Sequence, residues 1–131
     1  MEHVDDELSQ AECWELLAGA SVGRLALSIR ALPLILPVRY VVDGASVAVS
    51  LGRNGMPTAS VHDAVVAFAV DQFDEESALG WMVQLQGRAR LAPVGSGSEG
   101  PGPVDPGQVV RLSPGTVTGH RFTLQPFAPV V

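Results

Sequence analysis

Apolar residues alternate with polar or small residues along most of this chain, in runs that are separated by turn signals. Runs of this kind predict β-strands that have one buried face. We predict six strands, over residues 21–29, 34–42, 46–51, 64–73, 80–91 and 116–125. Asp43-Gly44 lies between the second and third runs and is a strong signal for a two-residue hairpin turn. Ala31-Leu32-Pro33 is expected to break the chain between the first and second.

One helix is expected near the start of the chain. Ser9 and Glu12 have the spacing of a capping box, in which a serine begins the helix and a glutamate three residues later returns a hydrogen bond to it. Gly19 is a suitable stop. The apolar side of this helix would be formed by three residues, Trp14, Leu16 and Leu17. The pattern therefore predicts a short helix over residues 10–18.

Two segments have the composition of loops. Residues 52–57 contain two glycines and a proline, and Pro57 is placed to open a short helix that runs through His62. In residues 93–107, eleven of the fifteen positions are Gly, Pro or Ser, which predicts a flexible surface connection. Six strands with little helix indicate a mainly β fold, an antiparallel barrel or sandwich, and 131 residues suit a single domain over 1–131.

The balance of charged and apolar residues changes the picture of the surface. Apolar residues make up 47% of the chain and charged residues only 17%, against about a quarter in an ordinary globular protein. We expect part of the surface to be covered by a partner subunit. The net charge is −6, and the eight basic residues are all arginine. Nucleic acids and anionic membranes need clustered positive charge, so both are excluded as expected partners.

The cysteine content and the start of the chain bear on its location. Cys13 is the one cysteine, so an intramolecular disulfide is excluded and no oxidising compartment is indicated. Residues 1–7 are acidic, unlike the basic start of a signal peptide, and no apolar run approaches the ~20 residues of a membrane span. We expect a cytoplasmic protein.

Candidate chemistry is sparse. The three histidines share no metal-ligand spacing with one another or with Cys13, so we expect no metal site. No serine has the context of a nucleophile elbow, and the catalytic residues stay unknown. His120 with Arg121 has two interpretations, a pair that faces an anionic ligand or an ordinary surface pair.

Six short segments, in their order and spacing, carry a resemblance to a known family. They are Val22-Gly23-Arg24-Leu25, Pro37-Val38-Arg39-Tyr40, Val66-Ala67-Phe68-Ala69-Val70-Asp71, Gly80-Trp81-Met82-Val83, Gly87-Arg88-Ala89 and Val117-Thr118-Gly119-His120-Arg121. The chain resembles the pyridoxamine 5′-phosphate oxidase-like FMN-binding split-barrel family, in its actinobacterial flavin- and deazaflavin-binding branch. The similarity covers roughly residues 8–92 and 109–125.

The resemblance implies a six-stranded antiparallel split β-barrel with one or two short helices, and a homodimer with cofactor sites at the subunit interface. It implies FMN or the deazaflavin F420 as cofactor. Contacts with the flavin ring would come from Tyr40, from Arg39 nearby and from the backbone of Pro37 and Val38. Trp81 would wall the pocket across the interface. The alternatives are an outward-facing Arg39–Tyr40 pair on an alternating strand and a Trp81 that fills the core or the interface.

The chain departs from the family where the cofactor phosphate is held. Members usually carry an Arg-Thr pair after the hairpin and a lysine in the next segment, and an ungapped alignment places Ser50-Leu51 and Met56 at these positions. A phosphate needs guanidinium, ammonium or backbone N–H donors, which these side chains do not provide, and Pro57 removes one N–H as well. Arg53 could replace the lost charge, or it could be a solvated loop residue.

Two functions from different classes follow. The first is a flavin- or deazaflavin-dependent oxidoreductase, because the cofactor carries the redox chemistry and needs no acid–base pair from the protein. The second is a non-catalytic dimeric split-barrel protein that has lost the phosphate site and binds another planar ligand such as haem, or none, because a fold does not fix a function.

Overall fold

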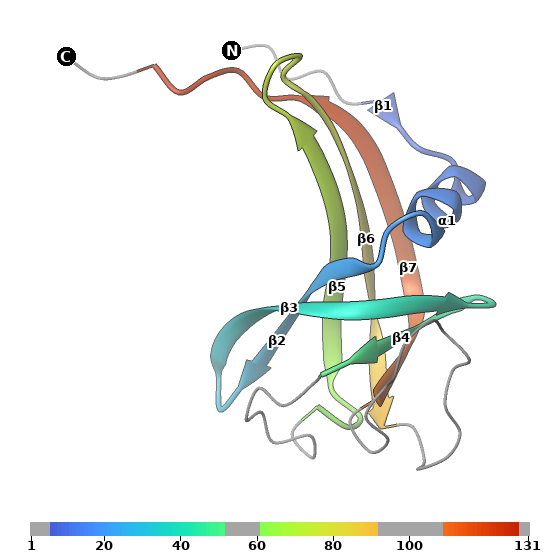
Figure 1. Ribbon diagram of the computed structural model, residues 1–131. Helices are drawn as coiled ribbons and strands as arrows, with labels where there is room; N and C mark the ends of the chain where they lie inside the picture. Colours follow the sequence, from blue (N-terminus) through green and yellow to red (C-terminus); the bar gives the residue numbers. More distant parts are fainter. Residues whose placement is uncertain (1–5, 52–60, 92–108, 129–131) are drawn as a thin grey trace.

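The strands of the chain pair into one closed antiparallel ring. The computed structural model describes residues 6–51, 61–91 and 109–128. Their elements are β1 (Asp6–Glu7), α1 (Gln10–Ala18), β2 (Val22–Ile29), β3 (Leu32–Asp43), β4 (Ser46–Ser50), β5 (Val65–Asp74), β6 (Leu79–Leu91) and β7 (Val109–Thr123). The strand order is β1-β7-β4-β3-β2-β5-β6, and pairing of β6 with β7 closes a ring of six strands (Figure 1). The expected mainly β, six-stranded antiparallel barrel is confirmed.

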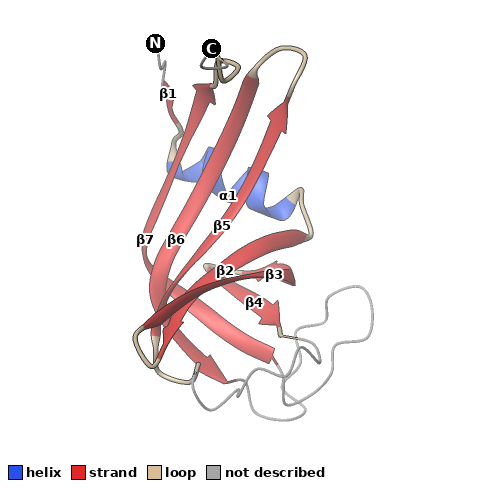
Figure 2. Ribbon diagram, turned by 90° about the vertical axis from the view of Figure 1, so that its left-hand side faces the viewer, coloured by secondary structure: helices blue, strands red, loops and turns tan. Residues whose placement is uncertain are grey.

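The single described helix forms as its capping residues predict. The Glu12 amide donates to Ser9 Oγ at 3.1 Å, and the Ser9 amide donates to Glu12 Oε1 at 3.0 Å, so both bonds of the capping box are present. Gly19 is the C-terminal cap. Cys13 and Leu17 are buried and belong to the core cluster. The helix lies beside the long strands β6 and β7 (Figures 1 and 2).

The turn between β2 and β3 is not where the sequence placed it. Arg30 and Ala31 form the turn, with φ angles of 52° and 65°, and β3 already begins at Leu32. Pro33 was expected to break the chain, but it lies in β3 opposite Ser28. The physical reason is that the first part of β3 is an edge strand on one side, because β3 pairs with β4 only over Arg39–Asp43. A proline there has no neighbouring strand on that side that needs its missing N–H.

The last strand begins earlier than predicted. It starts at Val109 instead of residue 116, because Ser113-Pro114-Gly115 is absorbed as an irregularity in the ladder instead of ending it. Gln86 pairs with Thr116 and Gly87 with Pro114, which leaves one extra residue on β7, as in a β-bulge. The predicted short helix from Pro57 lies largely outside the described residues, and residues 61–63 form a turn. The connection 93–107 also lies outside them.

The barrel interior is filled by the alternate residues of each strand. Phe68, Leu25, Leu85, Val83 and Leu112 are almost completely buried there. Gly23 makes room for the Phe68 ring, since a Cβ at this glycine would lie 2.4 Å from Phe68 Cζ. No charged or polar residue is buried among the described residues. Polar and charged side chains are therefore confined to the outer face, the strand ends and the turns.

Candidate functional site

The segment Pro37–Tyr40, expected to contact a cofactor, divides between the two faces of β3. Val38 and Tyr40 point into the core and are 5% and 4% exposed, whereas Pro37 and Arg39 are exposed on the outer face. This follows from the period of two along a strand. Only Pro37 and Arg39 therefore offer side chains to a ligand on the outer face, and Val38 offers its backbone.

Tyr40 is held on the inner side by specific contacts. Its hydroxyl donates to the Leu17 carbonyl of α1 at 2.5 Å, and its ring meets the Phe68 ring edge-on at a centroid distance of 4.9 Å. Burial raises the pKa of the Tyr40 hydroxyl to about 12. The ring of Tyr40 thus lies in the core, on the opposite side of β3 from Pro37 and Arg39.

The other predicted positions are also distributed by strand geometry. Ser50 pairs with Arg39 across β3 and β4 and is half-buried, but the next residue, Leu51, is 3% exposed and part of the core. Trp81 is half-buried on β6 and packs against the core cluster. Arg53 and Met56 lie outside the described residues. Pro37, Arg39 and Ser50 are therefore the predicted residues that share the outer face.

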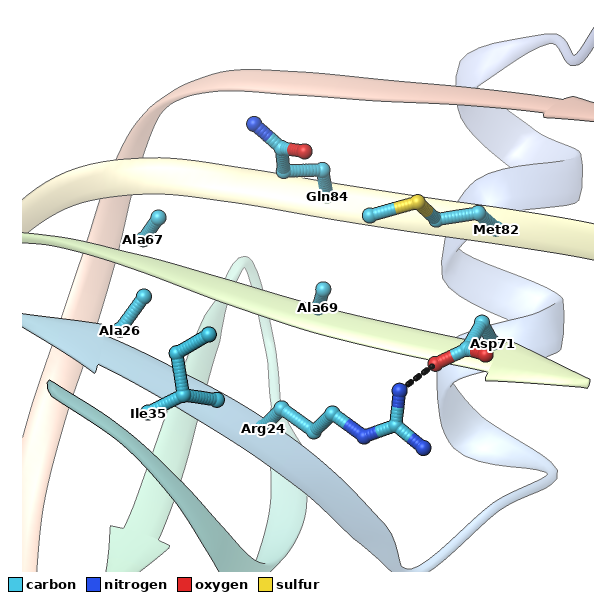
Figure 3. Close-up of a pocket in the computed structure, with 8 residues that line it drawn as sticks. All are labelled: Arg24, Ala26, Ile35, Ala67, Ala69, Asp71, Met82 and Gln84. Atoms are coloured by element: carbon cyan, nitrogen blue, oxygen red, sulfur yellow. Dashed lines mark ion pairs between the residues drawn. The ribbon is translucent and has the colours of Figure 1, made fainter.

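A groove crosses this outer face over β3, β2, β5 and β6. It has a volume of about 340 Å³. It is lined by Arg24, Ala26, Ile35, Ala67, Ala69, Asp71, Met82 and Gln84 (Figure 3). A second hollow of about 280 Å³ adjoins it, shares Arg24, Ala69 and Asp71 with it, and includes Pro37. The second hollow therefore connects the groove to Pro37, one of the predicted residues on the outer face.

Small side chains on paired strands create the groove. Ala26 on β2 pairs with Ala67 on β5, and Arg24 pairs with Ala69 in the same ladder. The three alanines form a floor that lacks the bulk of a usual strand side chain, while Ile35, Met82 and Gln84 stand around it (Figure 3). Neighbouring strands are about 5 Å apart, so the groove spans about 10 Å from β2, across the alanine floor, to Met82 and Gln84 on β6. Such a floor can accept a flat ring.

Two charges of opposite sign lie at one end of the groove. Arg24 Nη1 is 3.1 Å from Asp71 Oδ1, and the side chains are 63% and 30% exposed (Figure 3). The pair is close to neutral as a unit, but its separate groups still offer N–H donors and carboxylate acceptors. The end of the groove is therefore polar without a strong net charge.

His120 and Arg121, a candidate pair for an anion, point to opposite sides of β7. Arg121 Nη1 lies 3.4 Å from Glu12 Oε2 of α1, while His120 pairs with Met82 and its ring is 5.8 Å from the Phe122 ring. Successive residues of a strand face opposite sides, so the two side chains cannot bind one anion together. The interpretation of His120 and Arg121 as an anion-binding pair is therefore wrong. In the described part of the chain, no three His, Cys, Asp or Glu residues are grouped to hold a metal.

The groove itself was missed in the sequence. Its floor comes from β2 and β5, whose paired residues Ala26 and Ala67 are 41 positions apart, and this pairing cannot be read from either strand alone. The available signal was the alternation of alanine with large apolar residues in Ala67-Phe68-Ala69-Val70, where each alanine must face away from the core. Arg24 and Asp71 both belong to segments that carry the family resemblance, but the sequence did not predict that their side chains meet.

The comparisons with known proteins agree with this architecture. The family model described as pyridoxamine 5′-phosphate oxidase matches residues 9–94. No curated protein matches the chain. The structure is similar to the FAD binding protein from Mycobacterium smegmatis, at 26% identity and a TM-score of 0.72, over 91% of this chain and 99% of that one.

Two further solved structures have the same fold. A conserved protein of unknown function from Corynebacterium diphtheriae is 26% identical, with a TM-score of 0.72, over 92% of this chain and 98% of that one. An FAD-binding protein from Mesorhizobium loti is 20% identical, with a TM-score of 0.69, over 94% of this chain and 100% of that one.

In the described residues, the nine-residue α1 is too short to cross a bilayer.

Proposed function

The chain belongs to the pyridoxamine 5′-phosphate oxidase family, and from this premise we propose that its outer groove binds the ring of a flavin and that the protein is a flavin-dependent oxidoreductase. The observation that carries the proposal is the alanine floor with a polar pair at one end. The similarity to an FAD binding protein at 26% identity supports a flavin as the ligand. F420, a deazaflavin with a similar ring, is the alternative cofactor.

The residues of the groove fit a flavin ring. Its volume of about 340 Å³ falls within the range of small-molecule sites, and its walls are mostly apolar with a few convergent polar groups. Any larger side chain at Ala26, Ala67 or Ala69 would occupy the space that the ring needs. The polar groups at the rim are Arg24, Asp71 and Gln84, which can meet the heteroatoms of the ring.

The phosphate tail of FMN finds less support. Ser50 carries no charge, Leu51 is buried, and Arg24 already contacts a carboxylate. Two lost charge-assisted hydrogen bonds correspond to at least about a hundredfold in the dissociation constant. We propose that FMN binds more weakly here than in members that keep the arginine and the lysine. Arg53, which lies outside the described residues, is the candidate to compensate the loss at Ser50, Leu51 and Met56.

The protein's part in the reaction would be placement and shielding. A bound flavin supplies hydride and single-electron transfer, and no residue of the chain has to act as nucleophile. The alanine floor and Met82 would hold one face of the ring flat and exclude water from it. Arg39 and Ser50 lie on the same outer face and are placed to contact the part of the cofactor beyond the groove.

We also propose that the outer face is completed by a second copy of the chain. Ile35, Val65 and Val22 are 70%, 69% and 51% exposed, and they lie on the strands that form or flank the groove. A stable dimer would bury more than ~1,200 Å² and cover such side chains. Sedimentation at micromolar concentration should show a dimer, and a monomer would refute this part. A cytoplasmic location completes the proposal and is supported by the single cysteine, which is buried.

A second function is favoured by one observation, the uncharged end of β4. Ser50 and Leu51 replace the expected arginine and threonine, which supports a non-catalytic dimer that has lost its flavin and binds haem, another planar ligand or none. The spectrum of the purified protein separates the two proposals, because flavin and haem absorb in different visible bands. A colourless protein that titrates with neither ligand would refute both ligand proposals.

Ala69→Phe tests the placement of the flavin. Ala69 faces the groove, so a phenyl ring there would fill it and leave the core unchanged. Titration of riboflavin against the protein, followed by flavin fluorescence, should show affinity at least about tenfold weaker than the natural chain, since ~1.4 kcal/mol of lost contact is tenfold. Ala45→Phe adds the same group in the exposed β3–β4 turn and is the matched control. Equal affinities for all three proteins would place the flavin elsewhere.

A further inference from the structure

We propose that Arg24 and Asp71 together recognise the edge of a cyclic imide, so that the ring of the ligand, and not its phosphate tail, decides binding in this groove. A cyclic imide presents one N–H between two carbonyl oxygens, and flavin and deazaflavin rings both carry this edge. The inference rests on the proposed flavin function and deepens it. It assigns the Arg24–Asp71 pair a role in orientation and specificity.

The position of the pair supports this role. Both residues line both hollows, so the pair lies where the alanine-floored groove meets the hollow that contains Pro37. Arg24 is in register with Ala69, and Asp71 is the next outward-facing residue after Ala69 on β5. A flat ring on the alanines therefore has one edge directed at the pair (Figure 3).

The donors and acceptors of the pair match an imide. The 3.1 Å contact joins one guanidinium nitrogen to one oxygen of Asp71. A guanidinium has five N–H donors and a carboxylate has several acceptor positions, so each group retains capacity for a ligand. Asp71 can accept the imide N–H while Arg24 donates to the adjacent carbonyl. One charged residue alone could not satisfy both halves of this edge.

The same pair is poorly suited to a phosphate. A phosphate near charge −2 would meet the Asp71 carboxylate beside the guanidinium that it needs, and like charges repel. Gln84 and the three alanines add no positive charge to the groove. We therefore expect lumiflavin, which has the ring and no phosphate, to bind within about tenfold of FMN, a difference of no more than ~1.4 kcal/mol.

The test compares lumiflavin with N3-methyl-lumiflavin, in which the imide N–H is replaced by a methyl group. For the natural chain, the methyl group should weaken binding by at least about tenfold, because it removes the donor for Asp71. In Asp71→Ala this penalty should disappear. In the control Asp43→Ala the penalty should persist, because Asp43 does not line the groove. Its carboxylate instead pairs with Arg111, at 2.9 Å.

The outcomes separate this inference from the function on which it rests. Lumiflavin binding with no methyl penalty in the natural chain would overturn the imide recognition and leave the flavin proposal intact. A penalty that persists in Asp71→Ala would overturn the role of Asp71. No binding of any flavin would refute the proposed function. FMN binding more than about tenfold tighter than lumiflavin would show that the tail decides, against the inference.

Discussion

Replacing Tyr40 with phenylalanine would remove a hydroxyl whose contribution to stability depends on pH. In this chain the effect can be measured with little interference, because few other side chains titrate in the same pH range. Tyr40 is the one tyrosine, and the sequence has no lysine. Arginine stays protonated to above about pH 12. Between about pH 10 and 12, Tyr40 is therefore the main side chain that titrates, apart from Cys13, whose pKa is raised by burial and which both proteins share.

The magnitude can be worked out from two contacts. The Tyr40 hydroxyl donates to the Leu17 carbonyl at 2.5 Å, and such a bond is worth about 1 kcal/mol. The Leu17 carbonyl still accepts from the Ala20 amide at 3.4 Å in the variant, so it is not left without a partner. We expect Tyr40→Phe to lower the free energy of unfolding by about 1 kcal/mol near neutral pH.

At high pH the order should reverse. An unfolded tyrosine loses its proton near pH 10, whereas burial raises the pKa of Tyr40 in the folded protein to about 12. The unfolded state is therefore favoured as pH rises between these values, and each pKa unit is worth about 1.4 kcal/mol. The natural chain should lose roughly 2 kcal/mol by about pH 12, a loss that the phenylalanine variant lacks.

Urea unfolding of both proteins across this pH range measures the difference directly. The tyrosinate absorbance of the folded natural chain reports the pKa of the single tyrosine independently. A tyrosinate that forms near pH 10 while the protein stays folded, or a stability difference that is constant with pH, would refute the burial of this hydroxyl against α1.

Three further predictions concern other parts of the molecule. Gly23→Ala should lower the free energy of unfolding by about 1–3 kcal/mol, because its Cβ would lie 2.4 Å from the buried Phe68 ring. Gly115→Ala is the control and should change this free energy by less than ~0.5 kcal/mol, because a Cβ there has only the Gln86 carbonyl within 4 Å. Equal effects of the two substitutions in urea unfolding would argue against this packing. Ser9→Ala should cost about 1 kcal/mol through loss of the helix cap. Hydrogen bonds from Ser9, the one from its backbone amide first, lower the pKa of Glu12, so the stability that the Glu12 carboxylate contributes should be present above about pH 4.5 and fall in more acidic solution. An acid titration of melting temperature should show this fall in the natural chain and most of it in Ser9→Ala, which keeps the backbone amide. Ile35→Asp should shift the sedimentation of the protein from dimer to monomer, since this side chain is 70% exposed on the groove face, and Phe127→Asp, 91% exposed near the end of the chain, should not.

Local signals in the sequence predicted the local structure well. The capping box fixed the start of α1 because both of its hydrogen bonds are made within four residues. Asp43-Gly44 predicted the β3–β4 turn to within one residue, since Asp43 still pairs with Ser46 and the two turn residues are Gly44 and Ala45. Pro33 misled the prediction for the opposite reason. Whether a proline ends a strand depends on whether a neighbour needs its N–H, and that is a property of the folded sheet.

The site depended on non-local pairing and was predicted only in part. The resemblance directed attention to Pro37–Tyr40, but only the structure shows which side chains face outward. The alanine floor forms because β2 pairs with β5, and the ion pair at its end joins residues that are far apart in the chain.

The proposed function requires a flavin ring that lies on the alanine floor, and the methyl NMR signals of the alanines test this most directly. A flavin ring stacked on the floor should shift the methyl signals of Ala26, Ala67 and Ala69 strongly through its ring current on titration with riboflavin. The methyl signals of Ala48 and Ala89, which are almost completely buried outside the groove, should stay nearly unchanged. Binding of riboflavin that leaves the three groove signals unshifted, or that shifts Ala48 and Ala89 instead, would show that the flavin does not lie on the alanine floor.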